Sequence, residues 1–194
     1  GAPAAGRLEA LGRSAGCTLF QLVLGAWSLV LCRHAGQEEV VVGSPYHGRD
    51  AAGAESLVGY FVNVLALRVE ARRGRAASAL LSSARGAASG AMGHAAVPFQ
   101  SVVHELLPRR AHDASRNAVF QAMVAWGAEA VADAASSDDC YVSHVSVNLD
   151  TVTDRSFVKC EVTLSGAVSL FGAIDGSFEF NLDLFGYSTP VRLA

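Results

Sequence analysis

Residues 19–33 constrain the fold more than any other segment, because almost every position in them is apolar. Thr18, Gln21, Gly25 and Ser28 fall on one stripe at helical spacing, and threonine is a residue typical of a helix start. A helix that is apolar on nearly all sides must be surrounded by other elements. We therefore expect this helix at the centre of a layered body.

Size and composition favour a folded domain, and the lack of targeting patterns favours a cytoplasmic location. A chain of 194 residues that is 51% hydrophobic can bury well over half of its unfolded surface. The apolar stretch 19–32 is shorter than the roughly 20 residues of a membrane span, and no signal-peptide pattern is visible at the N-terminus. The 15 basic residues are scattered instead of forming a stripe. We expect a cytoplasmic protein that binds neither membrane nor nucleic acid.

The cysteines form no recognisable chemical motif. Cys17, Cys32, Cys140 and Cys160 contain no CxxC pair and no Cys/His cluster of zinc type, which favours buried thiols and no metal site. A bond between Cys140 and Cys160 would require neighbouring strands, which the sequence does not establish. No phosphate loop and no GxSxG elbow occurs either.

The other periodicities predict helices and strands that first alternate and then give way to strands. Helices are expected over residues 7–15 and 76–93, and between Pro98 and Pro108, where Phe99, Val102, Val103 and Leu106 share one face. Strands are expected over residues 39–44, 61–69, 119–126, 157–164, 167–171 and 177–182, with a surface loop at 127–139. This order predicts a single α/β domain with a mixed sheet flanked by helices.

Three segments resemble motifs of one enzyme family. Residues 58–68, VGYFVNVLALR, resemble (I/V)GxFVNT(Q/L)(C/A)xR, with Val64 in place of threonine. Residues 94–100, HAAVPFQ, resemble (H/N)QDxPFE without its Gln, Asp and Glu, and residues 112–121, HDASRNAVFQ, resemble RDxSRNPLFQ. The flanking matches are residues 18–20, TLF; 42–49, VGSPYHGR, similar to VGxPxxGR; and 183–185, DLF. Taken together, the chain resembles the condensation domains of nonribosomal peptide synthetases, and the resemblance spans about the whole chain.

The resemblance implies a chloramphenicol-acetyltransferase-like fold of two lobes that meet at a cleft, with residues 1–194 as the C-terminal lobe. The family's catalytic HHxxxDG belongs to the N-terminal half, and no His-His pair occurs here, so no catalytic residue is expected in this segment. The implied partners are the N-terminal lobe, donor and acceptor carrier proteins and a neighbouring adenylation domain. Substrates would arrive on the phosphopantetheine arms of the carrier proteins, with no cofactor bound directly.

The resemblance also implies roles at the cleft. Arg49 would form a salt bridge across the lobes to the aspartate of HHxxxDG, and the alternative is a solvated loop arginine. Tyr46 and His47 would lie near the cleft floor and contact the acyl chain, and the alternative is an ordinary Pro/Gly loop.

Two further sites follow from the residue types themselves. Asn63 lies inside an apolar strand, where an amide must find hydrogen-bond partners, and we favour the fixing of a neighbouring loop over substrate contact. A polar cluster, Asp113, Ser115, Arg116 and Asn117, precedes a strand. Its short polar side chains suit a turn held by side-chain-to-backbone hydrogen bonds, and we favour turn stabilisation over catalysis.

Two alternatives to a condensation domain stay open at this point. One is an epimerization domain or a stand-alone acyltransferase of the same superfamily, using a coenzyme A thioester or a carrier-bound donor. The other is a non-catalytic docking domain, which the missing Gln-Asp of residues 94–100 would suit. If the chain is one lobe of a two-lobed domain, the isolated lobe would expose apolar surface that normally packs against the other lobe.

Overall fold

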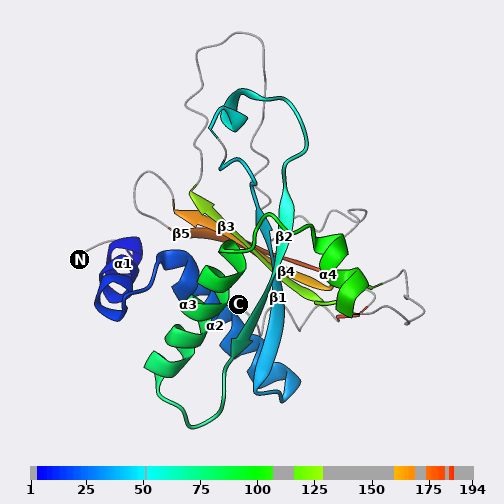
Figure 1. Ribbon diagram of the computed structural model, residues 1–194. Coiled ribbons are helices and arrows are strands. Elements are labelled where there is room, and N and C mark those ends of the chain that lie inside the picture. Colours follow the sequence, from blue (N-terminus) through cyan, green and yellow to red (C-terminus); the bar gives the residue numbers. More distant parts are fainter. Residues whose placement is uncertain are drawn as a thin grey trace.

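The computed structural model describes residues 4–50, 52–106, 116–128, 160–168, 174–181 and 184–185 (Figure 1). In chain order the elements are α1 (Ala4–Ala15), α2 (Leu19–Ala35), β1 (Glu39–Tyr46), the short 3-10 helix η1 (Ala54–Ser56), β2 (Asn63–Glu70), α3 (Ala77–Met92), α4 (Phe99–Leu106), β3 (Ala122–Ala128), β4 (Val162–Val168) and β5 (Ile174–Phe180). The five strands form one sheet in the order β2-β1-β3-β4-β5. The predicted mixed sheet with helices is confirmed.

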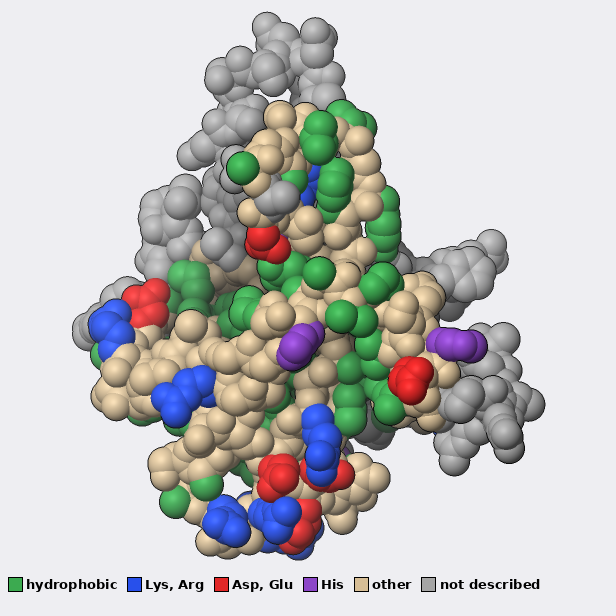
Figure 2. Space-filling view, in the orientation of Figure 1, with side chains coloured by type: hydrophobic (Ala, Val, Ile, Leu, Met, Phe, Trp, Pro, Cys, Tyr) green, Lys and Arg blue, Asp and Glu red, His purple; other side chains and the backbone are tan. Residues whose placement is uncertain are grey.

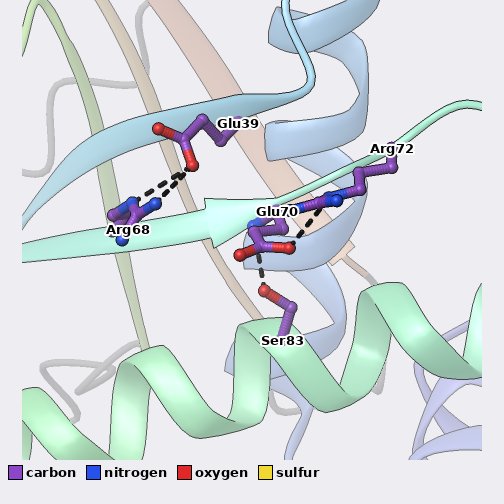
Figure 3. Close-up of polar contacts among 5 residues, drawn as sticks. All are labelled: Glu39, Arg68, Glu70, Arg72 and Ser83. Atoms are coloured by element: carbon purple, nitrogen blue, oxygen red, sulfur yellow. Dashed lines mark hydrogen bonds and ion pairs between the residues drawn. The ribbon is translucent and has the colours of Figure 1, made fainter.

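The sheet is parallel at its centre and antiparallel at its margins. The β1–β3 and β3–β4 pairs are parallel, whereas β1–β2 and β4–β5 are antiparallel. At one margin, Arg68 Nη2 lies 2.6 Å from Glu39 Oε2, which joins β2 to the start of β1 (Figure 3). The Glu70 N–H donates to Ser83 Oγ over 2.9 Å, which ties the end of β2 to α3 (Figure 3). Together these contacts hold β1, β2 and α3 as one unit.

Helix α2 is the central helix that its sequence predicts. Thr18 caps it, because the Thr18 hydroxyl accepts from the Gln21 N–H over 3.2 Å and the Gln21 side chain accepts from the Thr18 N–H over 3.0 Å. Gly25 lies against α3, where an added Cβ would meet Leu81 and Ala84 at ordinary contact distance. Between residues 19 and 32 only Ala26 is exposed.

The core lies between the sheet and the pair α2 and α3, which cover the same face (Figure 1). Leu24 and Trp27 of α2 contribute to it, together with Val42 of β1 and Val124 of β3. The Trp27 ring also packs on Phe178 of β5, with centroids 5.5 Å apart. The central helix thus connects strands from both ends of the sequence.

Helix α4 differs from its prediction in burial. Its apolar face exists, but Phe99, Val102 and Val103 are only half-buried, and Leu106 is 62% exposed. The helix packs mainly on the edge strand β2, so one side of the face has no described element over it. The periodicity therefore predicted the helix and its face correctly, and the burial of Leu106 incorrectly.

The strand predictions near the C-terminus also need correction. Residues 167–168 belong to β4 and do not start a separate strand, and residues 157–159 and 169–171 lie outside the described residues. Thr163 alternates with the apolar Val162 and Leu164, a pattern typical of a strand with one solvent-exposed face, but Thr163 is 7% exposed. Because β4 runs between β3 and β5, Thr163 is flanked in register by Met123 and Glu179, which shield it.

The remaining boundaries shift by a few residues. Strand β3 begins at Ala122 and not at residue 119, and it includes Gly127 and Ala128, which the prediction placed in a surface loop. The rest of that loop lies outside the described residues. Within the described part of the chain, no single helix is long and apolar enough to cross a membrane, and α1 with α2 reaches that length only as a pair bent by 92°.

Burial lowers the reactivity of the Cys32 thiol. Cys32 and Cys160 are both buried, as predicted, whereas Cys140 lies outside the described residues, so its bond to Cys160 stays a prediction. Burial, and then the nearby Glu39 carboxylate, raise the pKa of the Cys32 thiol. A raised pKa keeps the thiol protonated as pH rises through the neutral range, and only the thiolate is alkylated.

We therefore expect iodoacetamide at neutral pH to spare Cys32 in the native chain. The half-buried Cys17 should react first, and both residues should react once the chain is unfolded in denaturant. Peptide mass spectrometry after timed alkylation measures both rates. Equal native rates at Cys17 and Cys32 would contradict the burial of Cys32.

Candidate functional site

Four of the segments that carry the family resemblance meet around the carboxyl end of β1. Tyr46, the last residue of β1, pairs in register with Asn63, the first residue of β2. The chain between them forms a long loop that rises above the sheet and contains η1 (Figure 1). We call the described part of this loop, residues 47–50 and 52–62, the β1–β2 loop.

Arg49 holds the β1–β2 loop together. Its Nη1 donates to the carbonyl oxygens of Ala54 over 2.5 Å and Leu57 over 2.8 Å, and its Nη2 donates to that of Gly59 over 3.4 Å. The guanidinium carbon lies 4.4 Å from the centroid of the Phe61 ring, a cation–π contact. Arg49 is therefore not a merely solvated arginine. The implied salt bridge to an upstream aspartate stays a prediction, because that residue is not in this chain.

Tyr46 and His47 form a cluster with Asp50, a residue that the sequence patterns did not single out. The Tyr46 hydroxyl donates a short hydrogen bond to Asp50 Oδ2, and His47 Nε2 lies 3.8 Å from Asp50 Oδ1. The Tyr46 and His47 rings stack with centroids 4.8 Å apart, and the Arg49 N–H donates to His47 Nδ1 over 3.0 Å. The hydrogen bond to Asp50, followed by burial, raises the pKa of Tyr46.

Gly48 makes this turn possible. Its φ is +66°, a left-handed conformation, and a Cβ atom built on it would lie 2.1 Å from the Phe61 carbonyl oxygen. The backbone at Gly48 thus touches the far side of the β1–β2 loop. The close approach brings Asp50 back toward Tyr46.

Asn63 connects β2 to the segment before α4. Its Nδ2 donates to the carbonyl oxygens of Ala95 over 2.8 Å and Val97 over 2.7 Å, and its Oδ1 accepts from the Phe99 N–H over 3.1 Å. All polar atoms of the amide are therefore used on one neighbouring segment. Through these bonds Asn63 holds the segment before α4 to the start of β2.

We expect Asn63→Ala to lower the free energy of unfolding by about 2–3 kcal/mol, because two partly buried backbone groups and one exposed group lose their partner and water replaces only some of these bonds. Urea unfolding followed by circular dichroism measures the change. Asn63→Asp should destabilise at least as much, since its carboxylate would face two carbonyl oxygens. Gln100→Ala, at an exposed position of α4, is the control. A loss below about 0.5 kcal/mol in Asn63→Ala would contradict this role.

Asn117 bonds to the backbone of the segment before β3. Its Oδ1 accepts from the backbone N–H groups of Val119 over 3.0 Å and Phe120 over 3.3 Å. Arg116 behaves differently, because its Nη2 lies 2.9 Å from Glu161 Oε1 and makes an ion pair just before β4. Ser115 lies outside the described residues, so its role stays a prediction.

Phe120 joins this turn to the other motifs. Its side chain is 1% exposed, and its ring occupies the space above Gly43 of β1, where an added Cβ would lie 2.3 Å from a ring carbon. The ring also lies 5.4 Å from that of Phe99, the first residue of α4. Residues from four of the six motif-bearing segments, 42–49, 58–68, 94–100 and 112–121, therefore belong to one connected cluster.

The cluster has no features of a metal centre. Among the described residues, no three His, Cys, Asp or Glu side chains are grouped as ligands. A hollow of about 520 Å³ lies at the amino end of β1 beside Val40 and Val162. Val119 and Gln121 of segment 112–121 line it, but none of the predicted site residues does. The chemistry that the cluster offers is hydrogen bonding by Tyr46, His47 and Asp50.

Comparison with known proteins agrees with these motifs. The sequence profile described as "Condensation domain" matches residues 4–193. The chain belongs to the condensation-domain family. It is 39% identical over 190 residues to Tyrocidine synthase 3 of Brevibacillus parabrevis. The aligned region covers 97% of this chain and 3% of the synthase. It is 34% identical over 185 residues to Malpinin synthetase of Mortierella alpina, covering 95% of this chain and 2% of the synthetase.

Solved structures of this family share the fold of the chain. A four-domain nonribosomal peptide synthetase bound to AMP and glycine matches with a TM-score of 0.79 and 20% identity, covering 97% of this chain and 15% of the synthetase. The X-domain from teicoplanin biosynthesis matches with a TM-score of 0.75 and 22% identity, covering 97% of this chain and 42% of the X-domain chain. The predicted chloramphenicol-acetyltransferase-like architecture is thereby confirmed. The condensation-domain chain spans only a small part of the curated synthases that it matches.

Proposed function

We propose that this chain is the C-terminal lobe of a nonribosomal-peptide-synthetase condensation domain, and that the intact domain forms an amide bond. The observation that carries the proposal is the assembly of four family motifs into one cluster at the end of β1. Two further facts support the assignment to one lobe. The chain covers 38% of a solved condensation-domain chain, and its sequence contains no HHxxxDG.

In the proposed reaction, an acceptor amine attacks the carbonyl carbon of a donor thioester. The new C–N bond replaces the C–S bond, and the amine loses a proton while the thiol leaves. A histidine of the upstream lobe suits the proton transfer, because its pKa lies near neutrality. The donor and acceptor would be held on phosphopantetheine arms of carrier proteins, with an adenylation domain nearby. The multidomain synthetase among the solved relatives supports these partners.

The β1–β2 loop supports the proposed packing against an N-terminal lobe. Leu57, Val58, Tyr60 and Val62 are exposed on it, with Tyr60 at 89%. Figure 2 shows hydrophobic side chains gathered on this projecting part of the molecule. Exposed apolar side chains in one patch are typical of an interaction surface. Because the Arg49 hydrogen bonds already hold the loop, packing of the patch against the other lobe would cost little conformational entropy.

The coding sequence upstream of Gly1, together with an assay of the encoded domain, tests the proposal. We expect an in-frame HHxxxDG, and mass spectrometry should detect a dipeptidyl carrier protein when both carriers are loaded. Alanine in place of the second motif histidine should abolish the product and leave carrier loading unchanged. Racemisation of a bound aminoacyl group, without its transfer, would instead support an epimerization domain.

Arg49 provides a second prediction in the intact domain. Arg49→Ala removes three hydrogen bonds from a charged donor, each worth about 1.5–3 kcal/mol where it is shielded, so we expect the rate of amide formation to fall about 10- to 100-fold. Arg49→Lys should recover little, because an ammonium group cannot replace the guanidinium fork. Hydrogen exchange of residues 52–61 should increase in both variants.

The control for Arg49 is Arg75→Ala, which removes an exposed arginine with no ion pair among the described residues. It should leave both the rate and the exchange unchanged. A wild-type rate in Arg49→Ala, with residues 52–61 still protected, would contradict the role of Arg49.

A further inference from the structure

We propose that Tyr46, oriented by Asp50, accepts a hydrogen bond from an N–H group of the bound substrate, so that the pair favours a substrate that carries an amine. The inference rests on the proposed function, which brings the end of β1 to the substrate cleft. It assigns a role to Asp50, which lies outside the family motifs in this sequence.

The direction of the Tyr46–Asp50 hydrogen bond determines what the phenol can offer to a ligand. A phenol has one proton to donate and lone pairs that accept. The Tyr46 proton is committed to Asp50 Oδ2, so the phenol oxygen can offer a ligand only its lone pairs. The raised pKa of Tyr46 keeps this proton in place through the neutral range.

His47 contacts both Tyr46 and Asp50 and restricts how they are oriented. Its ring stacks on Tyr46 at an interplanar angle of 29°, which restricts rotation of the phenol ring. Its Nδ1 accepts from the Arg49 N–H, so the proton of the neutral imidazole is on Nε2, the nitrogen 3.8 Å from Asp50 Oδ1. Two donor groups therefore face one carboxylate.

The local charge favours an N–H donor. The Arg49 guanidinium donates to Ala54, Leu57 and Gly59, so it does not neutralise Asp50. A carboxylate behind the phenol polarises the O–H bond and makes the phenol oxygen a stronger acceptor. A substrate ammonium or amine is attracted to this pair, whereas a substrate carboxylate is repelled.

Binding to the 194-residue chain tests the inference without requiring catalysis. The probes are the N-acetylcysteamine thioesters of glycine and of acetic acid, which differ by the amine. We expect the glycyl thioester alone to shift the NMR signals of the Tyr46 ring. Tyr46→Phe, which keeps the ring and its stacking, should abolish the preference, and Asp50→Asn should reduce it. Ser82→Ala, at an exposed position of α3, should retain it.

The intact domain supplies the second readout. Tyr46→Phe should raise KM for the aminoacyl acceptor about tenfold, the loss expected for one hydrogen bond to a charged group, with kcat within about twofold of wild type. Equal shifts from the two thioesters, or an unchanged KM in Tyr46→Phe, would overturn the inference. Selective binding of the glycyl thioester by a domain that forms no amide would support this site and refute the proposed function.

Discussion

Phe120→Ala should lower the free energy of unfolding by about 3–5 kcal/mol, the range for removing a buried phenylalanine. The Phe120 ring is 1% exposed, fills the space above Gly43 and contacts the Phe99 ring, so its removal leaves a cavity bordered by β1 and α4. Urea unfolding of the chain, followed by far-UV circular dichroism, measures the loss. A loss below about 1 kcal/mol would show that the ring is not enclosed.

Gly43→Ala tests the same contact from the other side. The new methyl group would lie 2.3 Å from the Phe120 ring, and such overpacking costs about 1–3 kcal/mol. In the Phe120→Ala background the methyl group should cost almost nothing, because the ring it would strike is absent. The two losses should therefore not add. Gly127→Ala, in a strand with open space at its α-carbon, is the matched control, and additive losses would contradict the contact.

Gly48→Ala should lower the free energy of unfolding by about 3 kcal/mol, through two separate costs. A side chain in the left-handed region costs about 1–2 kcal/mol, and the collision with the Phe61 carbonyl oxygen adds an overpacking cost of about 1–3 kcal/mol. No side-chain rearrangement relieves this collision, because the oxygen is part of the backbone. Hydrogen exchange should increase over residues 49–61, and thermal unfolding gives the stability.

Gly74→Ala separates the two costs. Gly74 has a φ of +75°, close to that of Gly48, but an added Cβ would meet nothing within 4 Å. It should therefore show only the conformational cost, about 1–2 kcal/mol. If Gly48→Ala and Gly74→Ala lose the same stability, the approach of Gly48 to Phe61 is not as tight as described.

Features encoded locally could be predicted from the sequence. The all-round apolar pattern of residues 19–33 and the Thr18 cap define α2 without knowledge of its neighbours. The role of Asn63 was predictable for a related reason, since an amide in an apolar strand must find backbone partners nearby.

Features that depend on the course of a loop, or on what packs over a face, could not be predicted in this way. Asp50 meets Tyr46 and His47 only because the chain turns tightly at Gly48, and no periodicity marks that turn. The carbonyl partners of Arg49 depend on the course of the β1–β2 loop. The face of α4 was visible as a pattern, but the pattern does not say what covers it, so the exposure of Leu106 was missed.

Turnover by the purified 194-residue chain, compared with the same chain joined to its upstream lobe, tests the central claim most directly. Both proteins would receive the same aminoacyl donor and acceptor carrier proteins, and mass spectrometry would record the dipeptidyl product. We predict no product above background from the chain alone and multiple turnovers from the joined protein. Amide formation by the chain alone, or none from a joined protein with an intact HHxxxDG, would contradict the assignment of this chain as one lobe of a condensation domain.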